Sequence, residues 1–185
     1  PAGHNQLIEA IAKVNKNVVV ILLNGSAVST SWKKEVAAIV EAYLGGQAGG
    51  GAIADVLTGK VNPSGKLSET FPMRLEDTPT AIDFPSKDGV ANYGEGIFIG
   101  YRYYDKKKIE PNFPFGFGLS YTTFSYSDIK ANMTSAKDSD AITIAVKVKN
   151  TGKVAGKEVV QLYVHEKDAA LSRPENELKQ FEKIA

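Results

Sequence analysis

Glu95 is the residue whose surroundings first suggest chemistry. It lies between Gly94 and Gly96 in a stretch rich in tyrosine and phenylalanine, and glycines beside aromatic rings can expose a carboxylate in a pocket. Hydrolysis of a glycoside needs two carboxyl groups that flank one bond, and the spacing of the sequence identifies no partner for Glu95. A structural role, such as pairing with Arg102 or binding loop amides, is therefore the favoured interpretation.

A glycine pattern in the first third of the chain is typical of a nucleotide-binding turn. Gly49-x-Gly51-x-x-Ala54 follows a predicted strand and opens a predicted helix, and Glu69 lies near the spacing of a ribose-binding acid. The glycine run begins earlier, at Gly45, and glycines also allow a helix to pack closely on a strand. Nucleotide binding is therefore the minority interpretation.

The remaining reactive or aromatic groups point to structural roles. His4 and His165 are far apart and have no neighbouring His, Asp or Glu cluster, while Ser26 lacks the Gly-x-Ser-x-Gly pattern of a nucleophile. Trp32 and the tyrosines near Glu95 are more typical of core than of a sugar platform, and Lys106 to Lys108 are interpreted as a solvated loop. We assign no catalytic residue and no metal ligand, and the substrate-binding residues stay undetermined.

Composition narrows the classes of partner. The chain has 185 residues, 43% of them hydrophobic and 23% charged, which is ordinary for a globular protein of one or two domains. The net charge of +1 gives no basic footprint for nucleic acid or an anionic membrane. There is no cysteine, so disulfides and thiolate chemistry are excluded, and no apolar run reaches transmembrane length. The compartment, cytoplasmic or secreted, stays open.

The first part of the chain predicts alternating helices and strands. Residues 5–15 predict an amphipathic helix with Asn5 as its cap, and the aliphatic run in residues 17–23 predicts a parallel strand covered on both faces. A second strand is expected in residues 36–44, followed by a glycine loop and a helix over residues 52–57 that Gly59 ends. In open parallel sheets the loops after the strands bind ligands, so the loop of residues 24–32 is a candidate site wall.

The middle of the chain holds most of its aromatic residues. A short strand at residues 66–71 and a long surface loop over residues 72–90 are expected before it. Residues 93–124, which we call the aromatic seam, contain ten of the sixteen tyrosines and phenylalanines. The seam separates the strand–helix pattern from a part that predicts strands only, so it is expected to pack between two units.

After the seam, the sequence predicts a polar connector and then strands. Residues 125–140 are expected to form the connector. In residues 142–149 apolar and polar side chains alternate, as they do in a half-buried antiparallel strand. Residues 157–165 predict another strand, and a last segment follows at residues 178–184. A fibronectin-like sandwich needs about seven strands, more than this length supplies. The α/β part also leaves apolar faces uncovered, so the chain is expected to be incomplete at both ends.

In their order, the motifs of this chain resemble those of the β-glucosidases of glycoside hydrolase family 3. The resemblance covers nearly the whole chain, and it is specific because the motifs keep their order and spacing. One departure is Ala48, where the family usually has an acidic residue. The matching motifs are Asn17–Ser26, Gly46-Gln47, Ala52–Gly59, Asn62–Leu67, Glu95–Asp105, Phe113–Phe124, Asn150–Gly152, Gly156–Val159 and Glu177–Phe181.

The resemblance implies a fold class and a division of the chain. It implies an incomplete (α/β)6 sandwich, with flavodoxin-like layering and a mostly parallel sheet, followed by an incomplete fibronectin III-like β-sandwich. Residues 1–125 would be the C-terminal part of the α/β sandwich domain with the seam, residues 126–140 a linker, and residues 141–185 the first strands of the second domain.

The resemblance also implies a function for the longer protein. In this family an N-terminal (β/α)8 barrel carries the Asp nucleophile, and the acid/base Glu of similar bacterial enzymes would lie upstream of Pro1. Glu95 matches a different family position and receives no catalytic role. The implied activity is retaining hydrolysis of terminal β-D-glucosyl residues without a cofactor, with the rest of the enzyme as partner. The alternative is a non-catalytic carbohydrate- or nucleotide-binding α/β module with a β-sandwich adaptor.

Overall fold

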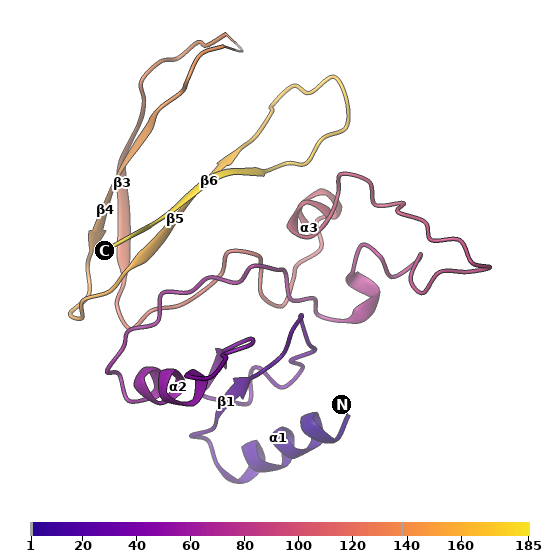
Figure 1. The fold of residues 1–185 in the computed structure, drawn as a ribbon, viewed down its shortest axis with the longest axis vertical. Helices are drawn as coiled ribbons and strands as arrows, with labels where there is room; N and C mark the ends of the chain where they lie inside the picture. The colour runs from indigo at the N-terminus through magenta and orange to yellow at the C-terminus, as the bar shows by residue number, and fades with distance from the viewer. Residues whose placement is uncertain (1, 138) are drawn as a thin grey trace.

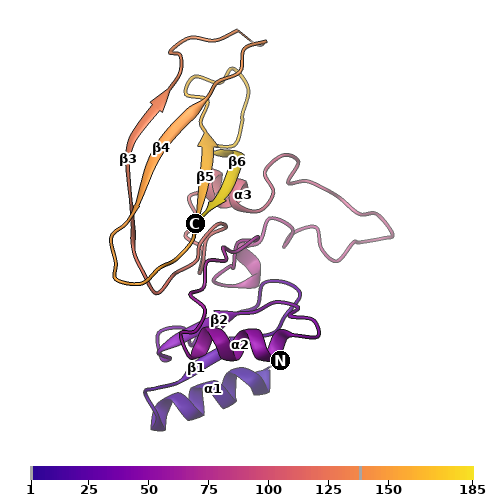
Figure 2. The same ribbon diagram turned by 60° about the vertical axis from the view of Figure 1, so that its left-hand side comes forward.

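The elements of the fold come from a computed structural model, which describes residues 2–137 and 139–185. Figure 2 shows α1, α2 and the pair β1–β2 gathered at one end and the two antiparallel pairs at the other. In chain order the elements are α1 (Ala2–Val14), β1 (Val19–Leu22), β2 (Ala38–Glu41), α2 (Gly49–Leu57), the 3-10 helix η1 (Leu75–Asp77), α3 (Tyr101–Lys107), β3 (Phe124–Ala131), β4 (Ile144–Asn150), β5 (Glu158–Val164) and β6 (Glu177–Ile184).

The first unit is built on a parallel pair of strands. β1 and β2 run parallel from the pair Val19–Ala38 to the pair Leu22–Glu41, as their aliphatic runs predict. β1 is only partly buried, which agrees with the expectation that the α/β part of this chain leaves apolar faces uncovered. The predicted cap was wrong: α1 begins at Ala2, so Asn5 lies inside the helix.

The second helix begins earlier than its apolar residues indicate. Its first turn consists of Gly49, Gly50 and Gly51, residues with low helix propensity that sequence patterns assign to a loop. The helix ends as predicted, since Gly59 has a φ of 74° and its amide donates a hydrogen bond to the Val56 carbonyl.

The segment before the seam is extended but does not form the predicted strand at residues 66–71. Its backbone pairs with the seam at separate points, where Leu67 N donates to Phe117 O and Phe71 N to Phe113 O, each over 2.8 Å. Pro114 lies between these pairs and has no amide hydrogen to donate, so no continuous ladder forms. Within the seam, Lys106 and Lys107 of the predicted lysine loop instead belong to the last turn of α3, where cations stabilise the helix dipole, and Lys108 follows the helix.

The second unit contains two antiparallel pairs, drawn in the upper part of Figure 1. β3 pairs with β4, so the predicted polar connector was wrong over residues 125–131. β3 is polar and mostly exposed, and its register shifts between Ser127 and Lys130, which breaks the alternation that reveals a strand. The strands predicted around residues 142–149 and 157–165 are present as β4 and β5, and β5 pairs with β6.

The architecture is an incomplete α/β unit followed by an incomplete β-sandwich, as expected. Its fully enclosed core is small and lies between the first unit and the seam. The buried apolar residues are Ala12, Trp32, Phe71 and Tyr104. None of the helices in the described ranges is long and apolar enough to cross a bilayer.

Candidate functional site

The loops that follow β1 and β2 meet at one edge of the parallel pair. The Asn24 side-chain amide donates to the Ser26 carbonyl over 2.7 Å and to Glu41 Oε2 over 3.3 Å, and Tyr43 N donates to Glu41 Oε1 over 2.9 Å. Burial raises the pKa of Glu41, and the charge of Glu69 adds to this effect. The Glu41 carboxylate therefore holds the two loops together.

The loop of residues 24–32 is anchored rather than open at its far end. The Trp32 side chain is 1% exposed, and its indole donates to Asn5 Oδ1 over 2.9 Å. Thr30 is equally buried and bonds to the Asn112 side-chain amide, which belongs to the seam. Trp32 is thus core, as favoured from the sequence, and has no face free to stack on a sugar ring.

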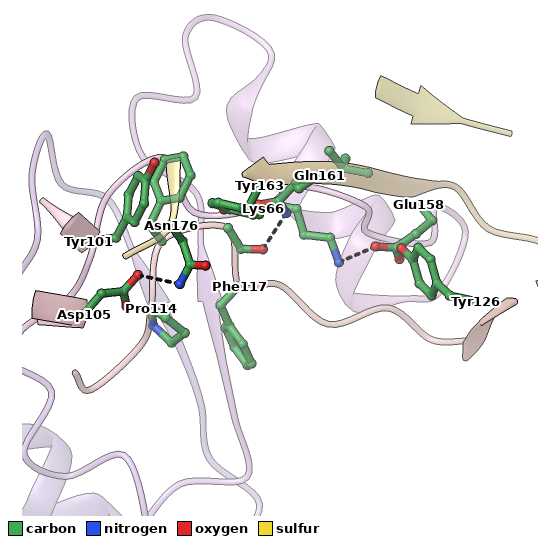
Figure 3. A pocket seen from close by; sticks show the side chains of 13 residues that line it. Lys66, Tyr101, Asp105, Pro114, Phe117, Tyr126, Glu158, Gln161, Tyr163 and Asn176 are labelled. Atoms are coloured by element: carbon green, nitrogen blue, oxygen red, sulfur yellow. Dashed lines mark hydrogen bonds and ion pairs between the residues drawn. The ribbon is translucent and has the colours of Figure 1, made fainter. Parts of the chain in front are cut away.

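A cavity lies between the seam and the second unit. It has a volume of about 600 Å³ and is lined by seam residues, by Lys66, and by β3, β5 and the loop before β6 (Figure 3). Tyr101 makes several of the contacts in this cavity. Its ring stacks on that of Phe115 with the ring centroids 5.0 Å apart, and it meets the ring of Tyr163 edge-on with the centroids 5.7 Å apart. Its hydroxyl accepts a hydrogen bond from Leu178 N over 2.8 Å.

The charged groups of this cavity are paired with other protein groups. Lys66 Nζ lies 3.0 Å from Glu158 Oε1 and donates to the Gly118 carbonyl over 2.7 Å, and Glu158 is 8% exposed. Asn176 Nδ2 donates to Asp105 Oδ2 over 3.2 Å. Figure 3 places Asp105 and Glu158 at opposite ends of the cavity, so they do not flank one bond as glycoside hydrolysis requires.

Two further side chains join the units, Gln161 in the wall of the cavity and Asn62 outside it. Gln161 Nε2 donates to the Gly116 carbonyl over 3.0 Å, and Gln161 Oε1 accepts from the Tyr163 hydroxyl over 2.7 Å. Asn62 Oδ1 accepts from Tyr121 N over 2.8 Å, and Asn62 Nδ2 donates to a carbonyl 93 residues away, that of Ala155, over 2.9 Å. The cavity is therefore a junction built from reciprocal contacts, which sequence spacing could not pair.

Glu95 lies apart from this cavity. Its Oε2 atom is buried and has no hydrogen-bond partner among residues 2–137 and 139–185. The suggested pairing with Arg102 was wrong, because the described ion pairs do not include it.

The structure does not assemble the other candidate groups into a site. His4 lies in exposed α1, and His165 bonds through its ring to the Glu175 carbonyl. The glycine pattern does begin a helix after a strand, but Glu69 lies near Glu41 and Tyr43 at the loop edge. In the part of the chain that the structure describes, no three His, Asp or Glu side chains gather to hold a metal ion.

Family models match both units of the chain. The model described as "Glycosyl hydrolase family 3 C-terminal domain" matches residues 1–121, and the model described as "Fibronectin type III-like domain" matches residues 158–185. The two matches fall on the α/β unit with the seam and on β5 and β6.

Characterised relatives are similar over the whole chain. Thermostable beta-glucosidase B of Acetivibrio thermocellus is 58% identical, and the match covers 100% of this chain and 24% of that protein. Beta-glucosidase BoGH3A of Bacteroides ovatus is 47% identical over 100% of this chain and 25% of its own. The chain therefore spans about a quarter of the length of these relatives.

Solved structures of β-glucosidases are also similar to this chain over nearly its whole length. The crystal structure of a Bifidobacterium adolescentis GH3 beta-glucosidase has a TM-score of 0.93 and 46% identity, over 100% of this chain and 27% of that one. A Kluyveromyces marxianus beta-glucosidase in complex with glucose has a TM-score of 0.91 and 47% identity, over 98% of this chain and 22% of its own. With a family model matching residues 1–121 and relatives this similar, the chain belongs to glycoside hydrolase family 3.

Proposed function

We propose that this chain acts as the C-terminal portion of a retaining β-glucosidase that hydrolyses terminal β-D-glucosyl residues from oligosaccharides or glycosides. The observation that carries the proposal is the 58% identity to Thermostable beta-glucosidase B along the whole chain. The contribution of the chain is structural, because the carboxylates of the cavity around Tyr101 are committed to Lys66 and Asn176.

The proposed chemistry uses two carboxyl groups outside this chain. One carboxylate attacks the anomeric carbon while a second carboxylic acid protonates the leaving oxygen, and the second group then activates the water that releases the sugar. This chemistry needs no cofactor. The nucleophile Asp and the acid/base Glu are proposed to lie in the part of the enzyme that the relatives carry and this chain does not contain.

Supporting roles follow for the elements described above. The loops after β1 and β2, tied together by Glu41, would form part of the rim of the active site. The junction around Tyr101 would hold the second unit in a fixed orientation, since small misplacements of remote elements lower the rate of an enzyme. For the domain division we propose that the second domain begins with β3 instead of after a linker at residues 126–140.

A grafted enzyme tests the proposal. This chain would replace the matching quarter of Thermostable beta-glucosidase B, and hydrolysis of an aryl β-glucoside would be measured for the graft and for the isolated chain. We expect turnover by the graft and none by the isolated chain. Turnover by the isolated chain, or a folded but inactive graft, would contradict the proposal.

The binding-module alternative has its own measurement. Calorimetry of the isolated chain with glucose, cellobiose and NAD would give heat of binding if the chain were an autonomous module. The fragment proposal expects no binding of any of the three.

A further inference from the structure

Residues 73–99, which we call the arm, form the most exposed apolar segment of the described chain. Eight of the eighteen large apolar side chains that are at least half exposed lie in these 27 residues, and Ile82, Phe84 and Tyr93 are each more than three-quarters exposed. Figure 1 shows the chain running outward between η1 and α3 before it returns. An apolar concentration of this kind marks a surface that another structure covers.

The arm makes few contacts with the rest of this chain. Among the described residues, its hydrogen bonds are mostly local turns, such as Phe84 N to Thr80 O over 2.9 Å, Val90 N to Lys87 O over 2.9 Å and Phe98 N to Glu95 O over 2.9 Å. The contacts that join it to α3 lie at its C-terminal end, where Arg102 N donates to Ile99 O over 3.2 Å and Lys106 Nζ lies 5.8 Å from the centre of the Phe98 ring. Local turns alone do not offset the conformational entropy of ordering an arm of this length.

The arm nevertheless has the shape that it has in a longer relative. The match to the Bifidobacterium adolescentis enzyme covers 100% of this chain with a TM-score of 0.93, and a score this high leaves little room for the arm to lie elsewhere. That relative is longer, because the matched part is 27% of its chain. The arm therefore has the same conformation in a protein that also contains the remaining three-quarters of the enzyme.

We propose that the arm docks on the part of the β-glucosidase that this chain does not contain, through its exposed apolar side chains. The charge of the arm fixes one property of that surface: the arm has five acidic and two basic residues, so the surface it covers should be neutral to basic. This inference rests on the proposed function, since it takes its partner from the same enzyme.

Hydrogen–deuterium exchange of the grafted enzyme tests the docking. Amides of residues 73–99 should exchange at least tenfold more slowly than those of residues 132–136, which lie beyond β3 and serve as the exposed reference. The double variant Ile97→Ser/Ile99→Ser should remove most of this protection. The matched control Ile129→Ser/Ile142→Ser changes two exposed isoleucines outside the arm and should leave it intact.

The outcomes separate this inference from the proposed function. An active graft whose arm exchanges as fast as residues 132–136 would overturn the docking alone. Equal loss of protection in the control variant would also overturn it, because the effect would then be one of general destabilisation. An inactive, folded graft with a protected arm would overturn the proposed function and leave the docking in place.

Discussion

At the scale of single residues, Gly116 is a constrained position in the junction. Its φ of 77° lies in the left-handed region, and a Cβ there would meet Gln161 Oε1 at 2.2 Å. Gln161 can swing away, but it would then lose its hydrogen bonds with the Gly116 carbonyl and the Tyr163 hydroxyl. A methyl group at this position would therefore disturb both the backbone of the seam and the side-chain contacts of β5.

The variant Gly116→Ala should destabilise the grafted enzyme by about 3 kcal/mol, the sum of left-handed strain and two lost hydrogen bonds. Calorimetric melting would show a lower midpoint. Gly25→Ala is the matched control, because Gly25 has an ordinary φ and no atom within 4 Å of the added Cβ, so its midpoint should stay near wild type. Equal midpoints for the two variants would count against a tight Gly116–Gln161 contact.

At the scale of elements, α3 connects the seam to the β5–β6 hairpin. Lys108, which follows the helix, pairs with Glu175, while Asp105 on the helix accepts a hydrogen bond from Asn176. Both partners lie in the loop before β6. The hairpin is thus oriented by one short helix of seven residues.

The pairing with α3 makes the hairpin loop sensitive to acid. The hydrogen bond from Lys108 lowers the pKa of Glu175 below its usual value of 4.5, so the stabilisation is fully present above the unfolded pKa and is lost as the pH falls through the folded pKa. In Lys108→Met, an NMR titration should show the pKa of Glu175 moving up toward 4.5. High salt should shift it the same way, because the pair is exposed.

Lys107→Met is the matched control for this titration. Lys107 occupies the neighbouring position and contributes no shift to Glu175, so the carboxyl should titrate as in the wild type. An unchanged titration in Lys108→Met would contradict the assigned cause.

The same elements show how far sequence reasoning reaches. β1, β2, β4 and β5 were predicted because aliphatic or alternating runs mark their buried faces. α3 was missed because seven residues rich in tyrosine show no helical period and follow Gly100, whose φ is 52°. β3 was missed because backbone pairing with β4 holds it and its side chains are mostly exposed. The junction pairs, such as Lys66 with Glu158, join distant segments, and no local pattern predicts them.

At the scale of the whole molecule, the α/β unit leaves apolar surface uncovered. On α1, Leu7 and Val14 are 60% and 86% exposed, and Leu23 just after β1 is 67% exposed. In an amphipathic helix such residues form the face that normally packs on a core. This exposure agrees with a chain that spans about a quarter of its relatives.

The isolated chain should therefore bind a hydrophobic dye strongly and aggregate, whereas the grafted enzyme should do neither, because the remaining domains cover these faces. Fluorescence of the dye and light scattering would measure both effects. In the isolated chain, Leu7→Ser/Val14→Ser should lower the fluorescence. A weak dye signal and a monodisperse isolated chain would contradict the exposure of these faces.

The hydrogen bonds of Asn62 set an order of events during synthesis of the chain. Asn62 leaves the ribosome well before Ala155, and at about 5 to 20 residues per second the intervening 93 residues take roughly 5 to 20 seconds. Until then, the turn around Asn62 can engage Ser120 and Tyr121 at most, and the aromatic rings of the seam have no β5 to pack on. The seam is thus an aromatic surface of the nascent chain that stays without its partner until β5 has been made, and a co-translational chaperone would protect it during that time.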